Sequence, residues 1–174
     1  MRVLLLAFFS ISFFASCSSS KLSAGKDYII VPDDRAKIIS GKINRSILEN
    51  DTSFAWFKEN MKWGEADASA IEAIKKNASK FSIVVVCGTW CHDSNNLLPK
   101  FYRLLDKAGY PESKVLLIAV DRTKHAYKQY EKKYGITNTP TFMVMQKGKE
   151  VGRVTENGKT GYFEKELGEI IAAL

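Results

Sequence analysis

The sequence predicts an α/β protein in which a central mixed β-sheet carries helices on both faces. Two predicted strands, 82–87 and 114–121, each contain a continuous aliphatic run, β-branched in the first, as strands buried on both faces do. Helical patterns separate and follow these runs, which indicates parallel crossover connections. Two more strand patterns, 141–146 and 150–155, are separated by a short turn and predict a terminal antiparallel hairpin.

The chain begins with a segment that we expect to lie outside this domain. Residues 1–16 contain the basic Arg2, an apolar run and then small residues, which is typical of a secretory signal and too short for a comfortable membrane span. The following "FASC" resembles the lipobox of bacterial lipoproteins, which implies that Cys17 carries lipid. We therefore expect an exported, membrane-anchored lipoprotein that faces the periplasm, with residues 17–33 as a flexible tether. A plain cleaved signal with an incidental cysteine is the alternative.

The next region, residues 34–65, is predicted to be an N-terminal extension that packs on the domain. A short apolar run at 36–43 predicts a strand. A short helix follows, and Asp51 or Thr52 is placed to cap it. Its aromatic residues recur at helical spacing, which indicates one buried face.

The domain itself is predicted to span residues 66–174. Asp67 suits the N-cap of its first helix, and Gly109 and Gly135 suit the ends of the next two. Pro99 lies inside the second helix and is expected to kink it. The helices expected in the domain are 67–81, 92–109, 124–135 and 161–174.

Cys91 is the candidate nucleophile, because it lies where the strand 82–87 gives way to a helix. Free backbone N–H groups and the helix dipole stabilise an anion at such a place, so a thiol there can ionise more readily than a free cysteine. His92 follows and would favour a thiolate as an imidazolium, although simple solvent exposure is an equal interpretation. The position one helical turn after Cys91 is Ser94, so no C-x-x-C disulfide can form there.

Cys87 is the other cysteine near this junction, four residues before Cys91. A disulfide between them requires Cα atoms within about 4.4–6.8 Å, and a strand-to-helix turn does not guarantee that approach. The alternative is that Cys87 is a small buried hydrophobic residue, as free cysteines often are. The sequence leaves both possibilities open.

"TWCHDS" after a buried strand, and "GITNTPTFMV" about fifty residues later, together resemble the thioredoxin family. The resemblance implies a thioredoxin-like fold, with Cys91 as the nucleophile and Trp90 before it. It also implies that Pro140 is cis and lies against Cys91, with the backbone of Thr139 positioned to pair with an extended substrate. The loop after the last strand is expected near the site, where Glu156 would place a carboxylate.

The predicted function is that of a membrane-tethered thiol–disulfide oxidoreductase of the cell envelope. Its Cys91 thiolate would act alone or paired with Cys87, on protein disulfides or oxidised thiols, with an electron-donor thiol protein and no cofactor. The alternatives are a non-catalytic binding module of the same fold and, less favoured, a cysteine-based metal site. The net charge of +7 suits a solvated lysine-rich face, and no nucleic-acid motif is present.

Overall fold

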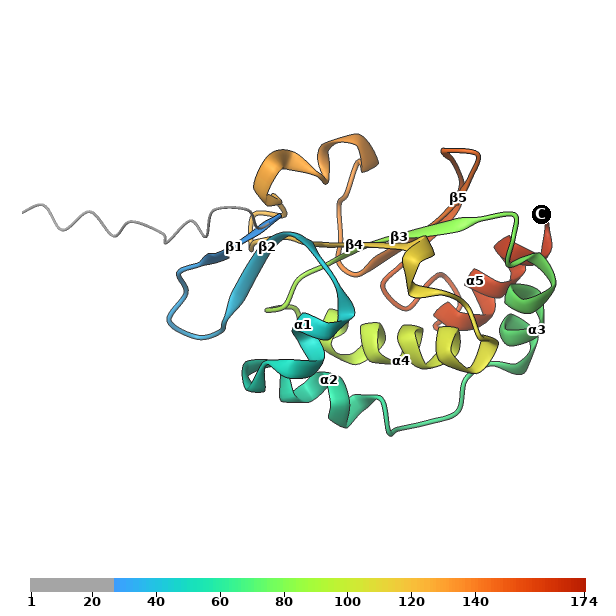
Figure 1. The fold of residues 1–174 in the computed structure, drawn as a ribbon, viewed down its shortest axis with the longest axis horizontal. Helices are drawn as coiled ribbons and strands as arrows, with labels where there is room; N and C mark the ends of the chain where they lie inside the picture. The colour runs from blue at the N-terminus through green and yellow to red at the C-terminus, as the bar shows by residue number, and fades with distance from the viewer. Residues whose placement is uncertain (1–26) are drawn as a thin grey trace, which may run out of the picture.

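The computed structural model describes residues 27–174, which form a mixed six-stranded sheet in the order β1-β2-β4-β3-β5-β6 (Figure 1). β3 and β4 are parallel, and every other neighbouring pair is antiparallel. The predicted signal and Cys17 lie outside the described residues. The strands are β1 (Tyr28–Val31), β2 (Ile38–Ile43), β3 (Ser82–Cys87), β4 (Val115–Ala119), β5 (Thr141–Gln146) and β6 (Lys149–Thr155).

All the α-helices lie on one face of this sheet (Figure 1). They cover a large core that contains alternate residues of β3, such as Ile83 and Val85, both fully buried. No helix in the described part of the chain is long and apolar enough to cross a membrane. The helices are α1 (Arg45–Asn50), α2 (Ala55–Asn60), α3 (Ala68–Asn77), α4 (His92–Ala108) and α5 (Phe163–Ala172), with short 3-10 turns at η1 (Thr52–Phe54) and η2 (Glu112–Lys114).

The opposite face is covered differently, and here the prediction of an α-helix at 124–135 is wrong. The segment forms two 3-10 turns, η3 (Tyr127–Gln129) and η4 (Lys132–Tyr134). Side chains take the place of helical backbone bonds: the Asp121 carboxylate accepts from two nearby backbone N–H groups, and buried Glu131 accepts from that of Ala126. Three non-glycine residues here have positive φ: Lys124, Lys128 and Gln129.

The N-terminal region contributes strands to the central sheet and does not merely pack on the domain. β2 pairs with β4, and β1 pairs with β2, so both are strands of the central sheet. The predicted tether at 17–33 is therefore corrected at its C-terminal end, because residues 28–31 are β1. Pairing with β2 provides hydrogen bonds for the backbone N–H and C=O groups of these residues. The sequence does not reveal this strand, because β1 is short and its surroundings are polar.

Helix α4 contains Pro99, as predicted, and runs through it from His92 to Ala108. Proline lacks the N–H that would bond the carbonyl four residues earlier, which is that of Asn95. The Asn60 side-chain amide, from α2, donates to this carbonyl at 2.9 Å. Asn60, from the N-terminal region, thus replaces the backbone hydrogen bond that Pro99 cannot make within α4.

Candidate functional site

The candidate site begins at the junction between β3 and α4. Cys91 is the N-cap of α4, and its carbonyl accepts from the Asn95 N–H at 2.9 Å. Its own N–H donates to the Gly88 carbonyl at 2.9 Å, which closes a tight turn. Ser94 is fully buried, and its hydroxyl oxygen accepts from the Gly88 N–H at 3.1 Å. In this structure Ser94 fixes the turn that presents Cys91 and does not face the solvent.

The thiol of Cys91 lies against the loop that precedes β5. Its Sγ is 3.2 Å from the carbonyl oxygen of Thr139, to which the thiol donates. The peptide bond between Thr139 and Pro140 is cis, and both residues are buried. The two segments that the sequence placed about fifty residues apart therefore meet at the sulfur of Cys91, which is itself half-buried.

Cys87 occupies a different environment at the end of β3. It is 1% exposed and belongs to the core beneath α4. Burial, and to a smaller degree the charge of Cys91, raise the pKa of the Cys87 thiol to about 12. Both cysteines are free thiols in this structure, so the Cys87–Cys91 disulfide is absent from it.

Trp90 is held by contacts that sequence reasoning did not find. Its indole Nε1 donates to the Val120 carbonyl at 3.0 Å, at the end of β4. The guanidinium of Arg122 lies 5.2 Å from the centre of the indole ring, within cation–π range. Asp33 holds that guanidinium, with 2.8 Å between its carboxylate and the Arg122 Nε. The arginine–carboxylate bond also holds the pKa of Asp33 far below its usual range.

Thr89 connects the same turn to the N-terminal region. Its hydroxyl accepts from the Ile39 N–H at 3.1 Å and donates to the Lys37 carbonyl at 3.0 Å. Gly88, beside it, allows Trp90 to approach, because a Cβ at Gly88 would lie 2.8 Å from the indole ring. Since these partners are about fifty residues away, no local pattern could have indicated them.

The remaining predicted site residues lie at the edge of this cluster. His92 is exposed at the first position of α4, and no hydrogen bond of its imidazole is found among residues 27–174. Glu156 lies beside the proline loop: its N–H donates to the Pro140 carbonyl at 2.7 Å, and its carboxylate accepts from the Asn138 amide at 2.9 Å. The carboxylate therefore supports that loop, and no contact with Cys91 is found in the described part of the chain. Within the same residues, no group of three or more His, Cys, Asp or Glu could hold a metal ion.

Comparison with known proteins identifies the family to which this fold and site belong. The model of the thioredoxin family matches residues 65–169, more than half of the chain, so the protein belongs to that family. A thioredoxin from Echinococcus granulosus is 29% identical over 100 residues, which cover 58% of this chain and 87% of the relative. Membership supports a function of the thiol–disulfide oxidoreductase type.

Solved structures agree with the fold. A Pseudomonas aeruginosa protein of unknown function has a TM-score of 0.51 at 14% identity, covering 75% of this chain and 90% of its own. An HIV epitope scaffold has a TM-score of 0.52 at 12% identity, covering 75% of this chain and 91% of its own. At such low identity these two likenesses speak for the fold alone.

Proposed function

We propose that the protein is a thiol–disulfide oxidoreductase that works through the thiolate of Cys91. One observation carries this proposal: the half-buried thiol lies at the start of α4, 3.2 Å from the Thr139 carbonyl and beside Pro140. In the first step, the Cys91 thiolate attacks one sulfur of a substrate disulfide. A bond forms between Cys91 and that sulfur, the substrate S–S bond breaks, and the second substrate sulfur leaves as a thiolate.

The mixed disulfide is resolved by an external thiol in this proposal. Its thiolate attacks the sulfur of Cys91, forms a new disulfide with it, and releases the substrate as a thiolate; a second external thiol then frees Cys91. Burial and a pKa of about 12 both argue against Cys87 as the resolving group, because attack requires an accessible thiolate. Ser94, in the usual resolving position, carries no thiol and is buried.

We further propose that the domain acts in the cell envelope, tethered by lipid on Cys17 and facing the periplasm. The apolar signal and the "FASC" sequence support this proposal. The substrates would then be protein disulfides or oxidised thiols, and the electron donor another thiol protein. Metabolic labelling with a fatty-acid analogue is expected to mark the chain and to leave Cys17→Ser unmarked. Equal labelling of both chains would contradict the lipid anchor.

Reduction of insulin disulfides with dithiothreitol as the external thiol tests the redox function. We expect Cys91→Ser to remove the catalysed rate, because the nucleophile is gone, and Cys87→Ala to retain at least about half of it. Cys87→Ala is the matched control, since it removes a thiol from the same junction. Loss of activity in both variants would instead indicate a catalytic pair.

A binding module remains the second candidate, favoured by the absence of a resolving thiol at Ser94. Such a module would hold an extended peptide at Thr139 without turnover. The same assay separates the two candidates. If the wild type reduces insulin no faster than Cys91→Ser does, and both proteins still bind peptide, the protein is a binding module and not an enzyme.

A further inference from the structure

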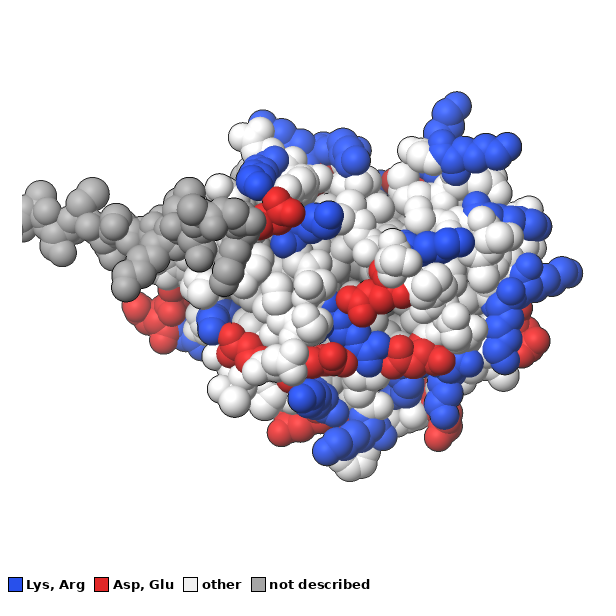
Figure 2. Space-filling model, viewed as in Figure 1, with Lys and Arg blue, Asp and Glu red and all other residues white. Residues whose placement is uncertain are grey.

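The positive charge of the described chain is concentrated in one segment, residues 121–153. This segment contains eight Lys and Arg residues and three Asp and Glu residues, whereas the rest of residues 27–174 contains fifteen and sixteen. Its η3–η4 part covers the face of the sheet opposite the α-helices (Figure 1). Figure 2 shows Lys and Arg side chains gathered over η3–η4 and at the tip of the β5–β6 hairpin. Such an uneven distribution gives this side of the domain a positive potential.

The parts of this segment form one continuous surface. The Arg153 guanidinium, from β6, donates to the Tyr134 carbonyl of η4 at 2.8 Å. Lys133 of η4 and Gly148 of the hairpin tip line the same groove. We call this surface the cationic face and define it by its five exposed lysines: Lys128, Lys132, Lys133, Lys147 and Lys149.

The carboxylates of the same segment do not neutralise these lysines. Glu131 is buried, and Asp121 accepts from backbone N–H groups of its own loop. Glu150 pairs with Arg153. Four lysines of the cationic face therefore have ammonium groups without an ion pair or hydrogen bond to any described residue: Lys132, Lys133, Lys147 and Lys149. Their charge is available to an anionic partner.

A groove within the cationic face adds hydrogen-bond donors. Its volume is about 370 Å³, its lining includes Lys42, Lys114 and Lys133, and none of the described residues that line it is Asp or Glu. Lys114 donates to the Ala78 carbonyl at 2.7 Å, which leaves two N–H donors of its ammonium group. Asp27 attracts Lys42 only weakly, because its main partner is a lysine of the cationic face. The groove therefore suits a phosphate group.

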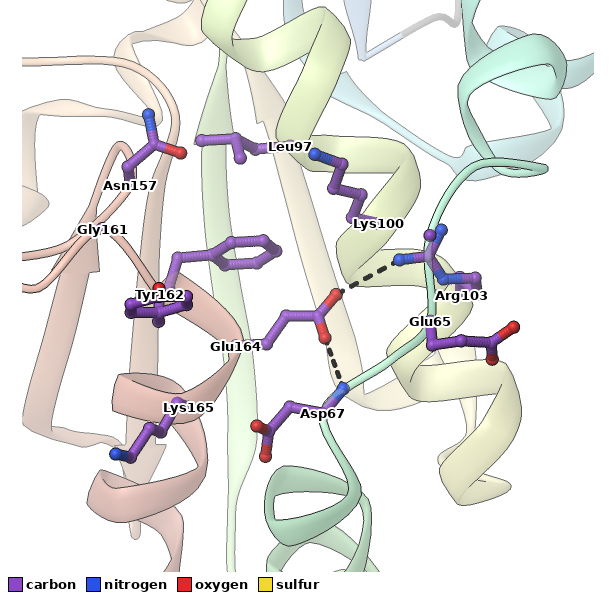
Figure 3. A pocket seen from close by; sticks show the side chains of 12 residues that line it. Glu65, Asp67, Leu97, Lys100, Arg103, Asn157, Gly161, Tyr162, Glu164 and Lys165 are labelled. Carbon is purple, nitrogen blue, oxygen red and sulfur yellow. Dashed lines mark hydrogen bonds and ion pairs between the residues drawn. The ribbon is translucent and has the colours of Figure 1, made fainter.

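The helix side of the molecule has a hollow of different character, between α4 and the start of α5 (Figure 3). Figure 3 shows Glu164 between Arg103 and the Asp67 backbone, and the two charged side chains are 3.6 Å apart. The charged residues that line this hollow are equally divided between the two signs: Glu65, Asp67, Glu164, Lys100, Arg103 and Lys165. Because these charges balance, the hollow offers no net attraction to an anionic surface.

The chain enters the domain beside the cationic face. Asp27, the first described residue, pairs with Lys128 at 2.8 Å and accepts from the Tyr130 hydroxyl at 3.1 Å. The ten residues 17–26 include two lysines and no carboxylate, and ten residues span at most about 35 Å when fully extended. A lipid on Cys17 would thus keep the η3 edge of this face within that distance of a bilayer. Such a tether makes weak attraction effective, because binding becomes an intramolecular step.

We propose that the cationic face docks the domain on the surface of an anionic phospholipid bilayer. Headgroup phosphates bind its exposed lysines, and one headgroup enters the groove beside Lys133. This attraction falls off within about 8 Å at physiological ionic strength, so it acts on the face that touches the bilayer. A bilayer is favoured over an acidic protein because the tether begins at this face and the free lysines spread along it. The proposal rests on the proposed lipid anchor at Cys17 and not on the reactivity of Cys91.

Lysine footprinting of the full-length chain on vesicles tests this proposal. Vesicles of phosphatidylcholine are compared with vesicles that also contain about 30% phosphatidylglycerol. Flotation isolates the bound chain, an amine-reactive reagent acetylates its lysines, and peptide mass spectrometry gives the rate at each site. We expect Lys132 and Lys149 to react at least about fivefold more slowly on the anionic vesicles, and Lys58 and Lys76 of the helix side to change less than about twofold. About 0.5 M NaCl should remove the protection.

Two charge reversals of equal size provide the matched control. Lys132→Glu/Lys149→Glu should remove the protection of the neighbouring Lys133, whereas Lys58→Glu/Lys76→Glu should keep it. All four substituted positions are exposed, so both variants are expected to fold, and thermal unfolding followed by circular dichroism checks this. Cys91→Ser should give the footprint of the wild type, so failure of the redox function and failure of docking are distinguishable.

Three results would overturn the proposal. The first is a wild-type footprint that is the same on both kinds of vesicle, or flotation with neither kind. The second is equal loss of protection in the two charge-reversal variants, since net charge and not this face would then govern binding. The third is equal protection without vesicles by glycerol phosphate or by polyglutamate, which would indicate a site for soluble phosphate or an acidic protein.

Failure of the lipid anchor gives a different result. The chain would then carry no fatty-acid label and would not float with neutral vesicles. If it still floats with the anionic vesicles and keeps the protection of Lys132 and Lys149 relative to the free chain, docking stands without the anchor.

Discussion

Cys87 and Cys91 are four residues apart, yet their surroundings have little in common. Cys87 ends a central strand and is 1% exposed, within the core beneath α4. Cys91 begins a helix, is half-buried, and touches the Thr139 carbonyl. The difference teaches that the boundary between strand and helix, and not the spacing of the thiols, decides which sulfur can react.

Several contacts fix the turn between β3 and α4. Buried Ser94 binds the Gly88 N–H, and Gly88 leaves room for Trp90. The N-terminal region reaches the same turn through Thr89, and reaches α4 through Asn60. Four predictions follow from this contrast between the two cysteines, in order of decreasing effect.

The largest expected effect is in thiol labelling. Iodoacetamide should modify Cys87 at least about a thousandfold more slowly than Cys91 in the native protein, because access to Cys87 requires unfolding. Peptide mass spectrometry resolves the two sites, and labelling in denaturant provides the control in which both react. Comparable labelling rates for Cys87 and Cys91 in the native protein would contradict the difference in access on which the monothiol mechanism depends.

The turn between the cysteines should depend strongly on Ser94. Ser94→Ala leaves the buried Gly88 N–H without its acceptor, and should lower the free energy of unfolding by about 1–3 kcal/mol. Urea denaturation measures this loss. Ser113→Ala, at an exposed serine without a hydrogen bond among the described residues, should change it by less than about 0.5 kcal/mol. A similar small change for Ser94→Ala would mean that the turn is held by other contacts.

The buried thiol of Cys87 should make the free energy of unfolding depend on pH in the alkaline range. The pKa of Cys87 is raised from 9.0 to about 12, so the folded protein keeps a proton that the unfolded chain loses. This contribution to stability is complete below pH 9 and is lost as the pH rises toward 12. The wild type should lose up to about 1.4 kcal/mol per pH unit more than Cys87→Ala in this window. Parallel stability curves for the two proteins would show that Cys87 is not buried as a neutral thiol.

The smallest expected effect concerns the support of α4 by the N-terminal region. Asn60→Ala should destabilise the protein by about 0.5–1.5 kcal/mol, because the Asn95 carbonyl loses its donor. In a Pro99→Ala background the new N–H can bond that carbonyl, so Asn60→Ala should then cost less. The double-mutant cycle from urea denaturation gives the coupling. No coupling would mean that Asn60 and Pro99 act independently.

Much of the fold could be read from local patterns. The strands at 82–87 and 141–146 and the long helix after Cys91 were predicted close to their observed limits. Asp67 caps α3 as expected, with its carboxylate accepting from the Ala70 N–H at 2.8 Å. These elements could be predicted because apolar periodicity, caps and turn residues all indicated the same structure.

Prediction failed where long-range contacts override local preference. The tyrosines of 124–135 recur at helical spacing, but a buried carboxylate and residues with positive φ break the helix into 3-10 turns. β1 has too few residues to stand out, and only its pairing with β2 makes it a strand. The contacts of Trp90 with Arg122, and of Arg122 with Asp33, join segments that no sequence spacing relates.

The sequence by itself determined that Cys91 starts a helix after a buried strand and that Ser94 cannot resolve a disulfide. Both follow from residue identity and periodicity, which act within a few residues. Only the tertiary structure decided that Cys91 meets Thr139 and that Cys87 is enclosed. These facts depend on which distant surfaces pack together, and packing is set by the whole core.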